Sequence, residues 1–388
     1  MGIYERFGVT PIINAAGTVT RYGGAPMLPE VLDAMHEAAS LTVNIDDLEE
    51  KAGSVIARVT GAEDGIVTAG AAAALLAGTA ACLTGNDLAR IDQLPDTTGL
   101  RNQLIMHRVH RNGFDHSIRA TGARIIEVGA GHQTFEWQFE AAITDQTAAI
   151  AYVLSPWVSE GALPLPAVVK IAKRAAVPVI VDGAAMLPPA ENLRRFIAEG
   201  ADLVCFSAGK ALRGPQGGGV LCGRRDLVRA AALNMSPNYS IGRSAKVSKE
   251  TIVGTLVALE NYWARDHAAD MRLWKAQADR IAHTIQHGTD CEVNLQFEKY
   301  RNIPVVEVHL GSLGRAADVQ QALCEGTPPV YVMGIDTARN TVALNPHALR
   351  SGEDEIVGRR FVESMQAVST KRDGVTPCRR SRGTHRSS

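Results

Sequence analysis

The sequence lacks the features that mark several classes of protein. Its six cysteines stand singly among 388 residues, with no Cys-x-x-Cys pair and no Cys/His cluster, which argues against a structural zinc site and a disulfide scaffold. The formal net charge is −1, so no excess of basic residues is available to bind nucleic acid or an anionic membrane. Aromatic residues make up 5% of the chain and hydrophobic residues 46%. We therefore expect a core of Ala, Val, Leu and Ile, and no metal ion.

A signal peptide and a true membrane span are also missing. The N-terminus, MGIYERFGVTP, carries charged residues and has no apolar core. Residues 65–83 are uncharged and long enough to span a bilayer, but they are mostly Ala, Gly and Thr. This composition indicates a buried strand, turn and helix of a large core. We expect a cytoplasmic protein with no membrane partner.

What the sequence does contain is a regular alternation of strand and helix patterns between about residues 45 and 225. Such alternation predicts an α/β fold with a mostly parallel sheet flanked by helices on both faces. The strands are expected at residues 65–68, 103–106, 123–127, 148–154, 178–181, 203–206 and 219–222. The helices between them are expected at residues 47–59, 71–83, 116–121, 165–175 and 191–199.

The rest of the chain follows a different pattern. A long helix is expected over residues 248–283, either continuous or broken midway, followed by the strands of a smaller C-terminal α+β domain. Those strands are expected at residues 303–308, 330–333 and 341–344, and Ser351–Asp354 has the spacing of a capping box that opens a last helix.

These patterns divide the chain into four parts. They are an N-terminal segment with a helix at residues 29–39, a large domain, a small C-terminal domain and a basic tail expected to be disordered. The predicted bounds are residues 1–44, 45–260, 261–369 and 370–388, in that order.

The chemistry is concentrated where two of the expected strands end. Asp182 closes the run VPVIVD, and Lys210 follows the run DLVCFS among small residues. The two are 28 residues apart, which is the length of a helical crossover between parallel strands. Both side chains should then emerge at the carboxyl edge of the sheet, where open α/β sheets bind ligands.

An aspartate and a lysine in this relation suit pyridoxal phosphate. A buried lysine has a lowered pKa and can form a Schiff base, while a carboxylate can hold the pyridine nitrogen protonated. Each residue alone is more often a helix cap or a solvated lysine. Their joint placement, with Ser207 three residues before Lys210, favours the cofactor.

A phosphate site is expected at the start of the helix after the first strand. Small residues there let backbone N–H groups approach an anion closely. Gly70, Ala71 and Ala72 are the candidate donors, and Thr68 or Ser207 could add a hydroxyl group. Small residues in such a turn can also serve helix packing alone.

Several further residues are weaker candidates. His107, His110 and His116 follow one strand, and His110 is our choice for a ring that stacks on the cofactor. Four cations in loops are candidates for binding a substrate carboxylate or phosphate, although solvated basic loops look the same. They are Arg21, Arg213, Arg243 and Lys246.

Several motifs in order resemble the fold-type I pyridoxal phosphate enzymes related to bacterial selenocysteine synthase (L-seryl-tRNA selenium transferase). Within that group the chain is most similar to the D-glucosaminate-6-phosphate ammonia-lyase branch. The resemblance covers residues 3–265. The motifs are VTPIINAAGTVT, VTGAEDGIVTAGAAAAL, LPDTTG, IMHRVHRNGFDH, VPVIVDGAA, CFSAGKALRGPQGGGVLCGR and GRSAKVSKETIVGTLVALENY.

The resemblance implies a role for each matched residue. Lys210 would carry the Schiff base, Asp182 would pair with the pyridine nitrogen, and His110 would stack on the ring, while Gly70, Ala71 and Ser207 would hold the phosphate. It also implies a homo-oligomer with sites near subunit interfaces, where Arg243 and Lys246 could serve a neighbour. Relatives that load tRNA have an extra N-terminal domain, whereas this chain reaches the shared core by Ile13, so no tRNA substrate is expected.

We therefore expect a pyridoxal phosphate-dependent lyase. Its substrate would be a β-hydroxy amino acid or amino-sugar acid, and α,β-elimination would give a 2-oxo acid and ammonia. Aldol cleavage, racemisation, transamination and a selenium transferase-like activity are the alternatives that keep the cofactor. A non-catalytic homologue is least favoured, because Asp182 and Lys210 are both present.

Overall fold

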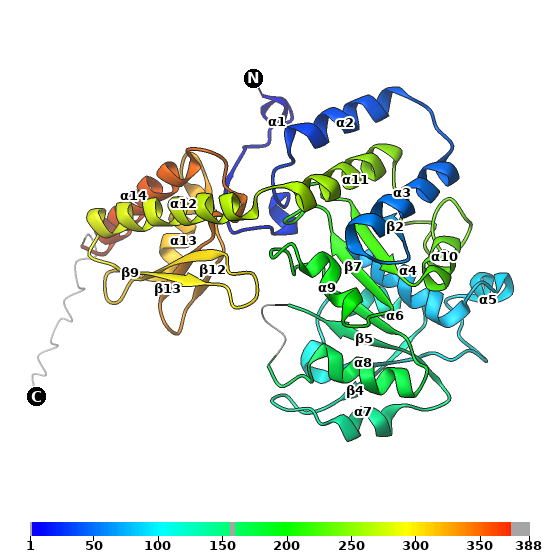
Figure 1. Ribbon diagram of the computed structural model, residues 1–388. Helices are drawn as coiled ribbons and strands as arrows, with labels where there is room; N and C mark the ends of the chain where they lie inside the picture. The colour runs from blue at the N-terminus through cyan, green and yellow to red at the C-terminus, as the bar shows by residue number, and fades with distance from the viewer. Residues whose placement is uncertain (1, 156–159, 374–388) are drawn as a thin grey trace, which may run out of the picture. The chain divides into compact units, whose positions relative to one another are not determined.

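The computed structural model describes residues 2–155 and 160–373, which form two compact units (Figure 1). The large unit consists of Thr18–Met271 and Glu298–Ile303. The small unit contains the described residues of Met1–Gly17, Arg272–Phe297 and Pro304–Ser388. These extents differ from the predicted bounds at residues 44 and 260, because the start of the chain pairs with a C-terminal strand and residues 18–44 pack in the large unit.

The large unit is built on a seven-stranded sheet with the order β2-β8-β7-β6-β5-β3-β4. Only β8 runs antiparallel to its neighbours, so the predicted mostly parallel sheet is confirmed. The strands are β2 (Asp64–Thr68), β3 (Gln103–His107), β4 (Arg124–Val128), β5 (Thr147–Val153), β6 (Val179–Asp182), β7 (Leu203–Ser207) and β8 (Gly219–Gly223).

Helices cover both faces of this sheet, as expected (Figure 1). One face packs against α3 (Ile45–Thr60), α8 (Leu165–Arg174), α9 (Asn192–Ala198) and α11 (Lys249–Ala264). The other packs against α4 (Gly70–Thr84), α6 (Asp115–Arg119) and α10 (Arg225–Leu233).

The uncharged run of residues 65–83 forms β2 and most of α4. Helix α4 is made of small residues because it packs closely on the sheet: a Cβ on Gly78 would lie 3.2 Å from Leu203 Cδ1. Within the described part of the chain, no helix combines the length and the apolar character that a membrane span requires.

The remaining elements of the large unit include some that the sequence patterns missed. The predicted long helix is broken, because α11 ends at Ala264 and α12 (His267–Gly288) begins three residues later. The helix near residue 29 is confirmed as α2 (Pro29–Ser40). Elements not predicted are α5 (Leu88–Gln93), α7 (Glu136–Ala142), α10, and the 3₁₀ turns at Thr20–Tyr22 and Arg108–His110.

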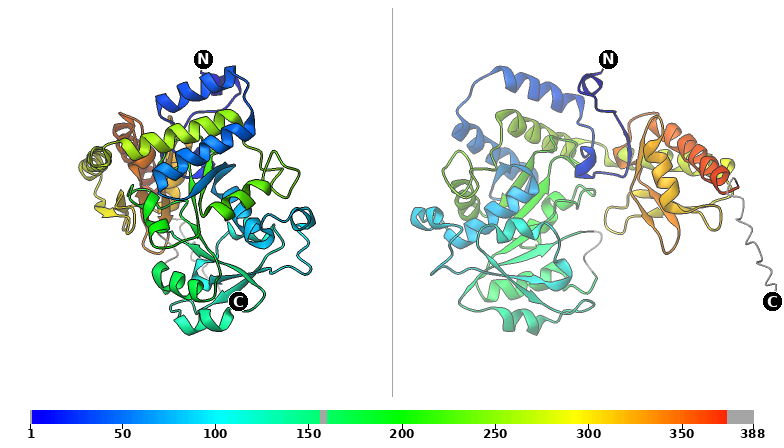
Figure 2. Two further views of the ribbon diagram at one scale, coloured as in Figure 1. Left: turned by 45° about the vertical axis from the view of Figure 1, so that its right-hand side comes forward. Right: turned by 180° about the vertical axis from the view of Figure 1, so that it is seen from behind.

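The small unit combines helices with two small sheets (Figure 2). Its antiparallel sheet has the order β12-β13-β10-β9, and β1 pairs in parallel with β11. The strands are β1 (Ile13–Ala15), β9 (Glu292–Phe297), β10 (Pro304–His309), β11 (Val330–Val332), β12 (Gly334–Asp336) and β13 (Thr341–Leu344). The helices are α1 (Ile3–Arg6), α12 from Arg272 onward, α13 (Ala316–Glu325), the 3₁₀ turn Pro346–Ala348 and α14 (Glu353–Asp373).

The predicted capping box of the last helix is wrong in its details. Helix α14 begins at Glu353, and it is the N–H of Arg350 that donates to the Glu353 carboxylate at 2.8 Å. Ser351 therefore lies two residues before the helix, and Asp354 pairs with Arg280 at 2.5 Å instead of completing a capping box.

Candidate active site

Asp182 and Lys210 meet at the carboxyl edge of the large sheet. Asp182 is the last residue of β6, which pairs in parallel with β7 and lies opposite Cys205. Lys210 follows the end of β7 in a turn whose backbone is closed by a bond from Arg213 N–H to Lys210 O, 3.0 Å. The crossover length between the two residues therefore predicted their neighbouring strands correctly.

The small residues around Lys210 allow two chain segments to cross at backbone contact. Ala25 N–H donates to Gly209 O at 3.0 Å, and a Cβ on Gly24 would lie only 2.3 Å from that oxygen. A Cβ on Gly209 would lie 2.5 Å from Gln216 Cα. Residues with side chains would force these segments apart, so the glycines hold the Lys210 turn in place.

The electrostatics of the site match a lysine that must lose its proton. Burial lowers the pKa of Lys210; the Asp182 charge opposes this effect and the Arg301 guanidinium adds to it. Burial also raises the pKa of Asp182, while the N–H of Ala184 and the charge of Lys210 act in the opposite direction. Both groups are thus largely removed from solvent, and each charge favours the ionised form of the other.

Asp182 is placed to accept one more partner. Its Oδ1 accepts the N–H of Ala184 at 3.0 Å and faces the Cys205 thiol at 3.7 Å. Within the described residues, Oδ2 has no hydrogen bond. A buried carboxylate with a free oxygen and a raised pKa fits a protonated ring nitrogen, which would restore its ionised form.

The start of α4 has the properties of an anion site. No side chain caps its first turn, Gly70 has a φ of +76°, and the space where a Cβ would stand on it is empty. The hydroxyl of Thr68 donates to Gly70 O at 3.0 Å. Ser207 pairs with Gly219 in the sheet, and a Cβ on Gly219 would lie 2.4 Å from Gly70 C. Sheet pairing therefore brings Ser207 to the same turn as Gly70 and Ala71.

The histidines after β3 form a buried pair. His107 and His110 are both fully buried, their ring centroids are 4.5 Å apart, and both rings contact Tyr152. Leu163 N–H donates to His107 Nε2 at 3.0 Å, and Val153 N–H donates to His110 Nδ1 at 3.2 Å. Burial lowers the pKa of His107 to about 4 and that of His110 to about 3.

Both imidazoles are therefore neutral near pH 7, with one ring nitrogen fixed as an acceptor. Their other nitrogens, His107 Nδ1 and His110 Nε2, are buried and have no partner among the described residues. His116 is exposed on α6. Stacking of His110 on a cofactor stays a prediction.

The four candidate cations are not equivalent. Arg213 lies in the Lys210 turn, where its Nε donates to Pro26 O at 3.0 Å. Arg21 is exposed in the segment that crosses this turn. Arg243 is half-buried, 5.8 Å from the Tyr239 ring, and Lys246 is exposed in the same loop between α10 and α11. Within the described chain, no hydrogen bond, ion pair or ring contact joins this loop to Lys210 or Asp182.

Sequence reasoning missed two residues near Lys210. Arg301 is 6% exposed and forms two hydrogen bonds with Glu298, at 2.6 and 2.8 Å. Both residues lie in the turn between β9 and β10 that belongs to the large unit. Cys205, the neighbour of Asp182, was also missed. No local pattern marks Arg301, because its relation to Lys210 depends on the tertiary fold.

Comparison with known proteins gives this geometry a context. The family model described as L-seryl-tRNA selenium transferase (SelA) matches residues 12–365. The chain belongs to this family. The predicted membership is thereby confirmed, and the match extends beyond residues 3–265 into the C-terminal region.

The proteins that this chain resembles are named for different enzymatic activities. A D-glucosaminate-6-phosphate ammonia lyase of Salmonella typhimurium is 35% identical, over 93% of this chain and 97% of that protein. A 5'-C-glycyluridine monooxygenase-decarboxylase of a Streptomyces species is 34% identical, over 93% and 92%. An L-seryl-tRNA(Sec) selenium transferase of Moorella thermoacetica is 25% identical, over 94% and 83%.

Solved structures confirm the predicted fold class. The structure of a D-glucosaminate-6-phosphate ammonia-lyase matches with a TM-score of 0.86 and 33% identity, over 95% of this chain and 99% of that one. A serine palmitoyltransferase structure with bound pyridoxal phosphate matches with a TM-score of 0.59 and 18% identity, over 92% and 88%, which shows the fold alone. The family is enzymatic, and the two ammonia-lyase matches support the predicted lyase.

Proposed function

We propose that this protein is a pyridoxal phosphate-dependent ammonia-lyase acting on a β-hydroxy amino acid or amino-sugar acid, of which D-glucosaminate 6-phosphate is the first to test. The observation that carries the proposal is the pair Asp182 and Lys210 at the ends of two adjacent parallel strands. The ammonia-lyase relative, at 35% identity over 93% of the chain, supports the reaction class.

The residues present fit this cofactor. Lys210 would carry it, Asp182 Oδ2 would accept its protonated ring nitrogen, and the first turn of α4 with Ser207 would hold its phosphate. When bound, the group supplies an electron sink for a carbanion at the substrate Cα. Burial of Asp182 keeps water away from its carboxylate, so the carboxylate interacts more strongly with the ring.

Lys210 would act as the base once the substrate amine has displaced it. Its lowered pKa leaves a larger neutral fraction of the amine to remove the Cα proton. Loss of the β-hydroxyl group as water and hydrolysis of the resulting enamine give a 2-oxo acid and ammonia. One water leaves and one enters, so the overall reaction is a rearrangement with release of ammonia.

Cations near the site would bind the substrate anions. Arg213 lies in the Lys210 turn, the charge of Arg301 acts on Lys210, and Arg21 lies on the crossing segment. Arg243 and Lys246 would act in a neighbouring subunit if the protein assembles as a homo-oligomer. The oligomer, the role of His110 and a cytoplasmic location stay predictions.

The second candidate is an oxygen-dependent decarboxylation of an amino acid. A monooxygenase-decarboxylase relative is nearly as similar to the chain as the ammonia lyase, at 34% identity. The same framework therefore serves different chemistry at the Cα bond. Aldol cleavage, racemisation and transamination differ from elimination in the same respect.

The test is to incubate the protein with pyridoxal phosphate and D-glucosaminate 6-phosphate, and to measure 2-oxo acid, ammonia, oxygen and carbon dioxide. Equal amounts of oxo acid and ammonia with no oxygen uptake would support the proposal. Oxygen uptake with carbon dioxide release would favour the second candidate. Turnover of another amino acid, with none of the sugar acid, would overturn the substrate. Absence of a visible cofactor band after dialysis against pyridoxal phosphate would overturn the cofactor.

A further inference from the structure

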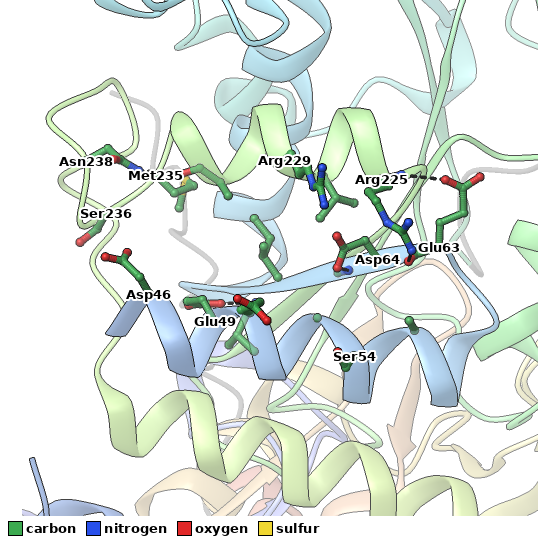
Figure 3. Close-up of a pocket in the computed structure, with 18 of the residues that line it drawn as sticks. Asp46, Glu49, Ser54, Glu63, Asp64, Arg225, Arg229, Met235, Ser236 and Asn238 are labelled. Carbon is green, nitrogen blue, oxygen red and sulfur yellow. Dashed lines mark hydrogen bonds between the residues drawn. The ribbon is translucent and has the colours of Figure 1, made fainter. Parts of the chain in front are cut away.

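A second cavity lies in the large unit, apart from the residues around Lys210. It has a volume of about 540 Å³, is open to solvent on one side, and is lined by α3, β2, α10 and the residues that follow α10 (Figure 3). This size suits a small organic molecule. Lys210, Asp182 and the other predicted site residues do not line it.

The cavity borders the free edge of β2, but this edge is closed to a further strand. Strand β2 is the first in the sheet and pairs only with β8. Gly65 N–H donates to Asp64 Oδ1 at 2.9 Å, and Val67 N–H donates to Glu49 Oε2 at 3.4 Å. Side-chain carboxylates thus occupy the backbone donors that an added peptide strand would need. A small molecule fits this cavity better than a peptide.

One end of the cavity offers hydrogen-bond acceptors. Asp46 and Glu49, three residues apart on α3, lie at the same end as Ser236 in Figure 3. Within the described residues, the carboxylate of Asp46 has no partner and Glu49 has only the Val67 N–H. An ammonium group has three N–H donors and would match these three side chains.

The helix on the opposite side offers positive charge. Arg225 and Arg229, one turn apart, extend from α10 into the cavity (Figure 3). Arg225 is engaged with Glu63, since its N–H and Nη2 donate to that residue at 3.1 and 3.2 Å. Arg229 makes no hydrogen bond or ion pair with the described part of the chain. It is the guanidinium available for an anionic ligand group.

We propose that this cavity binds a small zwitterion, with its ammonium group at Asp46, Glu49 and Ser236 and its carboxylate at Arg229. Ile66, Val228 and Ala232 also line the cavity, and their apolar side chains suit the methylene groups of an amino acid. The ligand class is therefore a short amino acid. This inference does not depend on the proposed reaction at Lys210.

The experiment compares three four-carbon probes that differ only in their charged ends: 4-aminobutanoate, 1,4-diaminobutane and butanoate. Each is titrated by calorimetry into full-length protein in which borohydride has fixed pyridoxal phosphate on Lys210, so that the probes cannot react there. A second series uses protein prepared without the cofactor. This series remains informative even if the proposed function is wrong.

The zwitterion should bind at least about tenfold more tightly than either of the two probes that carry charge of one sign only, because each charged hydrogen bond removed costs about that factor. Glu49→Gln and Arg229→Gln should each weaken it by about tenfold or more. Asp47→Asn is the matched control, since Asp47 is exposed on the same turn of α3 but does not line the cavity. It should leave binding unchanged.

Proton release provides an independent readout. The charged residues that line the cavity with Glu49 come from α3, from β2 and the residue before it, and from α10. They are Asp46, Glu50, Glu63, Asp64, Arg225 and Arg229. Burial raises the pKa of Glu49 to about 7, and a bound ammonium would lower it again. Binding should therefore release protons at pH 6 and almost none at pH 8.5, and Glu49→Gln should abolish the release.

Three results would overturn the proposal. Tighter binding of 1,4-diaminobutane would show a cation site without a carboxylate subsite. Equal binding to Asp47→Asn, Glu49→Gln and Arg229→Gln would place the probe elsewhere. Absence of saturable binding by 4-aminobutanoate in both series would exclude the site for this class of ligand.

Discussion

The Lys210 site and the α3–α10 cavity are built in contrasting ways. At Lys210, the backbone positions the site residues. Glycines let two chain segments cross closely, and the ends of two adjacent strands bring Asp182 and Lys210 together. In the cavity, side chains of two helices provide the polar groups around a wide space. Close backbone contacts shape the first site, whereas the second is a cavity of about 540 Å³. The difference fits the covalent chemistry proposed at Lys210 and the reversible binding proposed in the cavity.

The largest effect that separates them is expected from Lys210→Ala. Loss of the amine removes both the attachment point and the base, so turnover should fall by about a thousandfold or more. Binding of 4-aminobutanoate in the cavity of the cofactor-free variant should not change. Initial rates of 2-oxo acid formation and calorimetry give the two measurements. If the variant lost both properties, the two sites would not be independent.

Asp182→Asn should lower kcat by about a hundredfold, because an amide cannot hold the ring nitrogen protonated. KM should change much less, since Asp182 is expected to contact the cofactor and not the substrate. The absorbance maximum of the bound cofactor should also shift in wavelength relative to that of the native protein. If the variant kept both the position of the cofactor band and the kcat of the native protein, the proposed pairing of Asp182 with the ring nitrogen would be wrong.

Gly219→Ala should weaken pyridoxal phosphate binding by about tenfold, because crowding of this kind costs about 1–3 kcal/mol. The new Cβ would lie 2.4 Å from Gly70 C at the proposed phosphate site. Gly217→Ala is the control, since a Cβ there has no neighbour within 4 Å. Cofactor titration followed by absorbance checks both. Equal affinities would argue against the phosphate site at the start of α4.

Glu49→Gln should change the pH dependence of stability and leave turnover unaltered. Burial raises the pKa of Glu49 from 4.5 to about 7, so ionising it opposes folding as the pH rises from 4.5 to 7. The native protein should lose about 2 kcal/mol of unfolding free energy through this group between pH 5 and 8.5. The variant should not show this loss. Urea unfolding of both proteins at both pH values measures this loss. An equal change of unfolding free energy with pH in the native protein and the variant would contradict the raised pKa of Glu49.

The smallest effect is expected from Cys205→Ala. Its thiol faces Asp182 Oδ1 at 3.7 Å, a weak hydrogen bond whose loss should change kcat by about twofold. Cys222→Ala is matched to it, because Cys222 is equally buried and faces Val204 O at 3.6 Å. If both variants lost unfolding free energy to a similar extent, the effect would come from lost packing of the buried thiols. A change in the pH profile of kcat for Cys205→Ala alone would report its contact with Asp182.

The strands near the first site were predictable because each is a short apolar run that ends in a turn. The strand predicted at residues 203–206 is observed at Leu203–Ser207, and the strand predicted at residues 178–181 is observed at Val179–Asp182. Helix α10 was missed because no capping residue marks its start. It directly follows β8, and no side chain caps its first turn. The small unit's β9 was missed although its residues alternate strictly between polar and apolar, a pattern that does indicate a half-buried strand.

The candidate site was predictable in part for the same local reasons. Asp182, Lys210 and Gly70 each stand just after a strand, a position that sequence patterns locate well. Arg301 could not be found in this way, because its charge acts on Lys210 from a turn between two later strands. The burial of His107 and His110 was equally hidden, since it depends on Tyr152 and Phe139 from other elements.

The sequence by itself determined the seven strands of the large sheet in their chain order, and placed Asp182 and Lys210 at or just after the ends of two strands one crossover apart. Local apolar runs and turn residues are enough for that. Tertiary structure decided that β8 lies between β2 and β7, which brings Gly219 against Gly70 and leaves β2 at the edge beside the cavity. Strand order depends on how whole faces pack, and no local pattern encodes it.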